Sequence, residues 1–262
     1  MQEKNSDVAL QAGMNPEELS HIAVAEKDHW WYRGMRLGLA RILSRYVSLP
    51  AGGRVLEAGC GTGYTSEWLH QQYKWEVFSV DLESRAMQYA RSRRLPNAAQ
   101  ADIATLPFPD ASFDLVLSLD VLVHIPRGQE TKCVAEFFRV LKPSGTVVVR
   151  AAALDALHSR HSQFIEEKQR FTRGRLMRTL TESGLKVLYC SYANSLLLPV
   201  ALAKFRIWEP LARKPPATGV SNAPPWLNTL LLLPLACEAR WIGAGRRLPL
   251  GQSLIAVAQK AV

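Results

Sequence analysis

The sequence predicts an α/β fold with a mostly parallel sheet, on three observations from its first 150 residues. Short apolar runs, which are typical of buried strands, alternate with segments that carry apolar residues at helical spacing. The first run enters a loop with glycine at every second position, Gly59, Gly61 and Gly63. The next run ends at Asp81, about 20 residues further on. This order is typical of a sheet covered by helices on both faces.

The composition is that of an ordinary globular protein with room for one large domain and additions. The chain has 262 residues, of which 48% are hydrophobic and 21% charged. No run reaches the roughly 18 apolar residues of a spanning helix, and residues 1–20 lack the apolar core of a signal peptide. The four cysteines form no C-x-x-C pair, which favours free thiols over disulfides or zinc. We therefore expect a cytoplasmic protein.

The net charge of +9 raises the question of an acidic partner. The basic residues are spread out and lack the interleaved aromatic residues that stack on bases, so we expect no nucleic-acid partner. The densest clusters lie at residues 91–94 and 246–247. Solvated helix ends and loops are the simplest interpretation, and a weak attraction to anionic lipid is the second.

Residues 1–50 predict a helical cap, because residues 7–48 carry a helix-start signal and apolar residues at helical spacing. Three consecutive aromatic residues at 30–32 interrupt this pattern, since they cannot all face one side of a helix. They either plug the core or fold over a ligand as a lid, with Arg33 or Arg36 near a ligand carboxylate.

The remaining elements follow from the same patterns. Strands are expected at residues 54–57, 76–80, 112–118 and 146–150, with a further strand before Asp102. Helices are expected at residues 65–72, 84–93 and 128–141, and a turn at residues 142–145. Further on, we expect a helix at 171–183 with Thr172 as N-cap, a strand at 185–192 and a last strand at 253–258.

Two interpretations compete for the glycine loop. A dinucleotide fingerprint, G-x-G-x-x-G, would place its third glycine at position 64, which is Tyr64. The acid Glu57 would repel a pyrophosphate but suits a ligand that carries an ammonium group. The pattern E-x-G-x-G-x-G at residues 57–63 resembles motif I of the class I S-adenosylmethionine-dependent methyltransferases. Residues 51–150 contain further features of that family, and the chain looks similar to its type 11 members.

The resemblance implies a Rossmann-like, seven-stranded sheet that is mostly parallel, with the last strand antiparallel. An α/β domain that binds S-adenosylmethionine would then comprise residues 51–192 and 251–262. The N-terminal helical cap at 1–50 would precede it. An apolar helical insertion at 193–250 would lie between strands six and seven.

The resemblance also implies which residues contact S-adenosylmethionine. Glu57 and the glycines would hold the methionine end, Asp81 the ribose hydroxyls, and Asp102 with its neighbour the adenine. The full expected set is Tyr32, Glu57, Gly59, Cys60, Gly61, Gly63, Asp81, Leu82, Asp102, Ile103 and Leu119.

Three histidines are possible catalytic residues. Methyl transfer is an in-line displacement that depends mainly on positioning and on excluding water, and a hydroxyl acceptor also benefits from a base. His124 follows the fourth strand, where the family often carries a histidine, and it can equally serve as a packing residue. His158 and His161 lie after the fifth strand, at the expected substrate edge. No carboxylate completes an obvious metal triad with them, so no metal is expected.

The insertion is rich in leucine and interrupted by prolines. It emerges at the carboxyl edge of the sheet, where open α/β sheets bind ligands. A helical hairpin packed on the domain is the simplest interpretation. The alternative is an apolar tunnel for the acceptor, or an interfacial membrane contact aided by the basic residues of the insertion.

The sequence therefore predicts an S-adenosylmethionine-dependent methyltransferase that acts on oxygen in a small or lipid-like acceptor, such as a natural product, glycan or lipid. N- or C-methylation is the alternative within this class. A nicotinamide oxidoreductase is disfavoured by Tyr64 and Glu57. A catalytically silent domain that binds the cofactor and serves as an adaptor is the remaining alternative.

Overall fold

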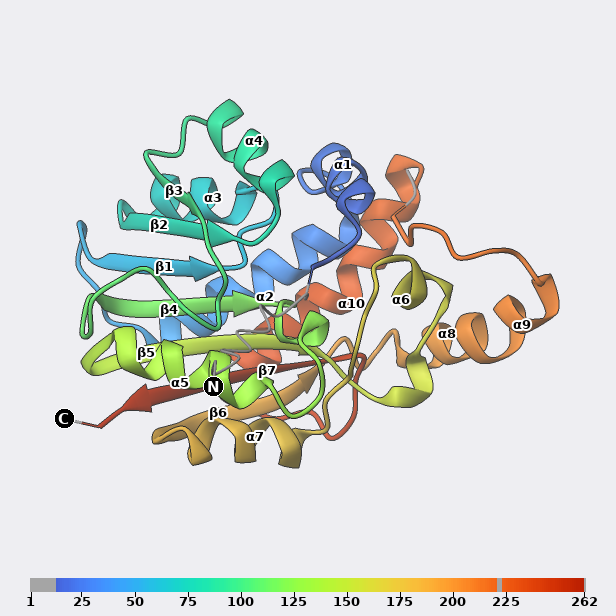
Figure 1. Ribbon diagram of the computed structural model, residues 1–262. Coiled ribbons are helices and arrows are strands. Elements are labelled where there is room, and N and C mark those ends of the chain that lie inside the picture. Colours follow the sequence, from blue (N-terminus) through green and yellow to red (C-terminus); the bar gives the residue numbers. More distant parts are fainter. Residues whose placement is uncertain (1–12, 221–222, 262) are drawn as a thin grey trace, which may run out of the picture.

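The computed structural model describes residues 13–220 and 223–261, so the part of the expected cap before residue 13 lies outside the described residues. In this part of the chain the sheet has seven strands in the order β3-β2-β1-β4-β5-β7-β6 (Figure 1). Strand β7 is antiparallel to both of its neighbours, and the other pairs are parallel. The predicted fold class is confirmed.

Most of the strands contain the apolar runs of the sequence, whereas the edge strand β3 is short and partly exposed. The strands are β1 Arg54–Ala58, β2 Glu76–Asp81, β3 Asn97–Gln100, β4 Phe113–Leu119, β5 Leu141–Ala152, β6 Leu185–Ala193 and β7 Ser253–Lys260. Central β1 pairs with β2 and β4, so that Leu56 stands opposite Phe78 on one side and Val116 on the other. Helices cover both faces of these strands, which explains why the runs are continuously apolar.

One face of the sheet is covered by α2 Trp30–Tyr46, α3 Tyr64–Tyr73 and α10 Pro225–Gly243. These helices share a buried cluster with the strands, to which Leu43, Leu69 and Ile242 belong. At the β3 end of the sheet, α1 Pro16–Ala25 packs on α4 Ser84–Ser92. Leu19 lies there in a small cluster with Met87.

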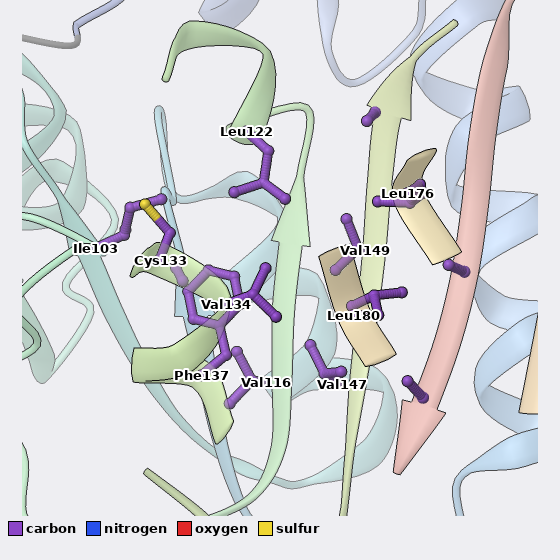
Figure 2. Packing of buried hydrophobic residues seen from close by; sticks show 14 of the residues in the cluster. Ile103, Val116, Leu122, Cys133, Val134, Phe137, Val147, Val149, Leu176 and Leu180 are labelled. Atoms are coloured by element: carbon purple, nitrogen blue, oxygen red, sulfur yellow. The ribbon is translucent and has the colours of Figure 1, made fainter. Parts of the chain in front are cut away.

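The other face is covered by α5 Glu130–Val140 and α7 Arg173–Glu182. Figure 2 shows Val134 and Phe137 of α5 beside Val116, and Leu180 of α7 beside β5. All four side chains are fully buried. The predicted N-cap of α7 also forms, because the Thr172 side chain accepts the Arg175 N–H. This core fixes the carboxyl edge of the sheet, where the site lies.

The structure departs from the expected pattern at one turn. Strands β3 and β4 are joined by a loop, and the sequence predicts no helix between them either. Strand β5 begins already at Leu141, and the predicted turn is an irregularity inside it. Ser144 there has φ 61°, a left-handed conformation that glycine adopts most readily.

The insertion does not fold as the expected helical hairpin. Its first part is a continuous helical stretch made of α8 Leu198–Ala203, a π-helical segment Lys204–Trp208 and α9 Glu209–Ala212. This stretch projects away from the sheet, whereas α10 runs along α2 (Figure 1). Leu235 of α10 lies directly over Gly34 of α2, and the Trp30 N–H donates to Asn228 Oδ1 at 3.0 Å. Within the described residues, the two halves of the insertion therefore do not pack against each other as a hairpin.

Candidate functional site

A cavity of about 380 Å³ opens at the carboxyl edge of the sheet. The glycine loop after β1 and the ends of β2, β4 and β5 form its floor. The first two helices cover it from one side, and the segment after β5 and Phe205 of the insertion line another part. Thus the cap, the insertion and the sheet edge meet at one site, where ligands bind in open α/β sheets.

The glycine loop follows a path that side chains would obstruct. Gly59, Gly61 and Gly63 all have positive φ values, of 91°, 53° and 73°. A Cβ atom on Gly59 would lie 2.8 Å from Val121 Cγ1, and one on Gly63 would lie 2.7 Å from Leu95 Cδ1. A Cβ atom on Gly61 would lie 3.6 Å from its nearest neighbour, Leu19 Cδ2. The backbone there is therefore open to the cavity. A ligand can therefore approach the peptide units closely at Gly61.

Asp81 stands at the end of β2 beside this loop. Its Oδ2 accepts the Gly61 N–H at 2.7 Å, and its Oδ1 accepts the Glu83 N–H at 3.0 Å. Burial raises the pKa of Asp81, and these backbone donors act in the opposite direction. A carboxylate oxygen has lone pairs beyond one backbone bond, so Asp81 can also accept hydroxyl groups of a ligand.

Glu57 lies deeper, under the start of α3. Its carboxyl group accepts the Ser66 hydroxyl, which also lies 2.7 Å from the Ser79 hydroxyl. Burial raises the pKa of Glu57 to about 8, and the nearby charge of Asp81 adds to this effect. Near neutral pH the group therefore holds a proton, unless a cation in the cavity favours the charged form.

Most of the predicted cofactor residues meet in this one cavity. The predicted residues found in its lining are Tyr32, Glu57, Gly59, Cys60, Gly61, Asp81, Leu82, Asp102, Ile103 and Leu119. Gly63 instead occupies the N-cap position of α3. Asp102 Oδ1 accepts the Ala104 N–H at 2.8 Å, which fixes the loop after β3.

The three predicted histidines differ in their surroundings. His124 is 8% exposed, lines the cavity, and its Nδ1 has no hydrogen-bond partner among the described residues. Burial lowers the pKa values of His124 and His161 to about 4. His161 also lines the cavity, but its Nδ1 accepts the Gly219 N–H at 2.8 Å, so its proton sits on Nε2. His158 is exposed and outside the cavity lining.

Sequence reasoning missed the polar contact that joins the cap to the glycine loop. Glu26, at the end of α1, accepts hydrogen bonds from the Thr62 hydroxyl and from Arg93. Arg93 also donates to the Thr62 carbonyl at 2.8 Å and pairs with Glu67 at 2.6 Å. These partners lie 36 and more residues from Glu26 in the sequence, and no local pattern signals such a contact.

Arg150 is a second residue that the sequence analysis missed. It is 7% exposed, lines the cavity, pairs with Asp120 and donates to Ser253 Oγ at 2.9 Å. Burial lowers the pKa of Arg150 to about 10. A single arginine directly after the apolar run at residues 147–149 was the signal that could have found it. Of the two arginines proposed in the cap, Arg36 lines the cavity and Arg33 is exposed.

The residues present fit S-adenosylmethionine. The open backbone at Gly61 admits a ligand, Asp81 offers acceptors for hydroxyl groups, and Asp102 stands on the far side of the same cavity. Residues 13–220 and 223–261 contain no group of three histidine, cysteine or acidic side chains able to hold a metal ion. Nor do they contain a helix long and apolar enough to cross a membrane.

Known proteins match this chain in the same region. Residues 56–149 match the family model described as a methyltransferase domain. A Mycobacterium tuberculosis protein, named a probable S-adenosylmethionine-dependent methyltransferase, is 33% identical over 123 residues, which are 47% of this chain and 42% of its own. A 2-methyl-6-phytyl-1,4-hydroquinone methyltransferase of Synechocystis is 34% identical over 106 residues, which are 39% of this chain and 33% of its own. The chain thus spans less than half the length of these curated relatives.

A solved structure extends the likeness to the fold. Phosphoethanolamine N-methyltransferase 2 of Haemonchus contortus, in complex with S-adenosyl-L-methionine, matches 86% of this chain and 52% of its own, with a TM-score of 0.54 and 18% identity. The matched domain contains the second half of β1, the glycine loop and Asp81, on a sheet with the strand order described above. Residues 56–149 of this chain therefore match a methyltransferase domain, and this region is similar to proteins named as S-adenosylmethionine-dependent methyltransferases.

Proposed function

We propose that this chain transfers the methyl group of S-adenosylmethionine to an oxygen atom of a small or lipid-like acceptor. The observation that carries the proposal is that one cavity joins the glycine loop and Asp81 to His124, whose Nδ1 lacks a partner in the described structure. The cavity therefore brings residues suited to a nucleoside together with a buried group able to take a proton.

The cofactor would lie along the edge of the sheet. Asp102 and Ile103 would hold the adenine, Asp81 the ribose hydroxyls, and the glycine loop with Glu57 the methionine end. Hydrogen bonds from two backbone N–H groups already orient the Asp81 carboxylate. An ammonium group near Glu57 would favour the charged form of its carboxyl group, which burial otherwise disfavours.

His124 is the residue best placed to serve as the base. When bound, S-adenosylmethionine supplies a methyl group on a positively charged sulfur, which an acceptor oxygen can attack in line. Because burial lowers the pKa of His124 to about 4, its imidazole is neutral near pH 7 and can accept the acceptor's hydroxyl proton. His161 already uses its one imidazole lone pair for the Gly219 N–H, so it can only donate in this arrangement.

This role of His124 can be tested with His124→Gln. We expect kcat for methyl transfer to fall about 10²–10⁴-fold, the usual contribution of a positioned base. The affinity for S-adenosylhomocysteine should stay as in the wild type. An unchanged kcat would show that the histidine only packs beside the cofactor site. His158→Gln, at the exposed histidine, serves as the control.

A lipid-like acceptor is supported by the insertion. Phe205 lines the cavity, while Ile207, Trp208 and Leu211 of the same helical stretch are 61–75% exposed. Exposed Lys204 lies among them. The Synechocystis relative carries the name of a phytyl hydroquinone methyltransferase. We infer that this stretch contacts an anionic membrane surface and admits the acceptor from it.

The first test is calorimetric titration with S-adenosylhomocysteine and, in parallel, with NADH. We expect micromolar binding of the first and none of the second, followed by methyl transfer in a screen of lipid and phenolic hydroxyl acceptors. Binding of NADH alone would overturn the proposal. Binding of the cofactor without turnover on any acceptor would favour a silent adaptor.

A further inference from the structure

A second cavity, of about 60 Å³, lies beside the large one between α2, α10 and the sheet. The two cavities share the lining residues Met35, Arg36, Thr65, Leu119 and Arg150. Thr65 follows the glycine loop directly, and Leu119 is the last residue of β4. The small cavity is thus a side chamber of the cofactor site, and the insertion forms one of its walls.

The insertion places one carboxyl group in this chamber, that of Glu238. The residue is 4% exposed and lies in α10, which is otherwise mostly apolar. Its Oε1 accepts the Leu196 N–H at 2.5 Å, which fixes the side chain. Its Oε2 is buried and has no hydrogen-bond partner within the described residues. A buried acceptor of this kind is unfavourable unless a ligand or water supplies a donor.

Two guanidinium groups line the same chamber. Arg36 donates to the backbone carbonyls of Glu26 and Lys27, and Arg150 pairs with Asp120. Burial lowers the pKa values of both arginines, because it disfavours the charged form. One buried and one half-buried cation, together with one free carboxyl oxygen, complement an amino-acid group, which carries a carboxylate and an ammonium.

The strand order shows which end of the cofactor would reach this chamber. Asp102 follows β3, Asp81 ends β2, the glycine loop follows β1 and Leu119 ends β4, and these four strands are adjacent in that order. A ligand with its adenine at Asp102 and its ribose at Asp81 therefore points its far end past the glycine loop toward Leu119. Leu119 lines both the large cavity and the chamber.

We propose that the insertion completes the cofactor site, with Glu238 Oε2 accepting a hydrogen bond from the ammonium group of the methionine end. This inference rests on the proposed function, because it needs S-adenosylmethionine in the large cavity. The ammonium group has three N–H donors, so Glu57 can take one and Glu238 another. The insertion then determines affinity for the amino-acid part of the cofactor and not for its nucleoside part.

The test compares two ligands with Glu238→Gln. S-adenosylhomocysteine carries the amino-acid end, and 5′-methylthioadenosine has the same nucleoside and sulfur without it. Glutamine keeps an oxygen for the Leu196 N–H but turns N–H donors toward the chamber. We expect the calorimetric Kd for S-adenosylhomocysteine to rise about tenfold to hundredfold, as for lost hydrogen bonds to charged groups. The Kd for 5′-methylthioadenosine should change less than about twofold.

Glu182→Gln, the same substitution at an exposed position of α7, is the matched control and should change neither Kd. Equal weakening of both ligands by Glu238→Gln would overturn the inference, because the residue would then act through the fold. Unchanged binding of both would overturn it as well. If the wild type binds neither ligand, the proposed function fails and this subsite with it.

Discussion

At the scale of single residues, Asp81 links the loop to the proposed ligand. Asp81→Ala removes the acceptor for the ribose hydroxyls and also the bond to the Gly61 N–H. We expect the affinity for S-adenosylhomocysteine to fall by about 1.5–3 kcal/mol, the range for hydrogen bonds to a charged group. Calorimetric titration measures this change, with exposed Asp155→Ala as the control. Unchanged affinity would show that Asp81 does not bind the ribose hydroxyls.

Glu57 makes stability depend on pH in a predictable direction. Burial raises its pKa from 4.5 to about 8, so between these values the unfolded chain is ionised while the folded chain keeps the proton. The stability that the group contributes is complete below about pH 4.5 and is lost as the pH rises toward about 8. Glu57→Gln keeps an oxygen for Ser66 and has no proton to lose.

We therefore expect Glu57→Gln to gain stability relative to the wild type as the pH rises from about 5 to about 8. The free energy of unfolding in urea at several pH values measures the difference. Cofactor should be absent, because an ammonium group would change the titration. If the curves of variant and wild type run parallel across this range, the carboxyl group is not buried in the neutral form.

At the scale of elements, the contact between α2 and α10 depends on one glycine. A Cβ atom on Gly34 would lie 2.8 Å from Leu235 Cβ, so Gly34→Ala must push the two helices apart. We expect the free energy of unfolding to fall by about 1–3 kcal/mol, as for other overpacked contacts. Chemical denaturation measures this loss.

Gly38, in the same helix, provides the matched control. Apart from its chain neighbours and the backbone of its own helix, no described atom would lie within 4 Å of a Cβ atom on Gly38. Gly38→Ala should therefore stabilise the protein by about 0.5–1 kcal/mol, because alanine loses less backbone entropy in a helix. Equal effects of the two substitutions would show that α10 does not pack closely on α2.

The stretch from α8 to α9 is the element proposed to touch membranes. The double variant Trp208→Ser with Leu211→Ser removes two of its most exposed apolar side chains. We expect a smaller fraction of this variant than of the wild type to co-sediment with anionic vesicles at low salt. Met177→Ser, at an exposed residue of α7, should co-sediment like the wild type. If the wild-type protein remains wholly in the supernatant, this stretch does not bind anionic membranes and the proposed membrane contact is wrong.

At the scale of the whole molecule, the sequence could predict what local patterns determine. Buried strands must be apolar on both faces, and the glycine loop needs positive φ values, so both features are visible in the residues themselves. The Glu26–Thr62 contact, and the choice of α2 as the partner of α10, join segments distant in sequence. The choice of such packing partners depends on how the folded surfaces fit together and not on the periodicity of the sequence. For this reason the expected helical hairpin in the insertion was wrong.

The position of β7 has a consequence for how the chain folds. The five parallel strands β3 to β5 come from one continuous segment, and they can pair as that segment is synthesised. Strand β6 is made next but cannot pair with β5, because the place between them belongs to β7, which follows about sixty residues later. Until it arrives, β5 presents an open edge that can pair with another chain. The insertion therefore sets how long the nascent protein depends on protection from aggregation.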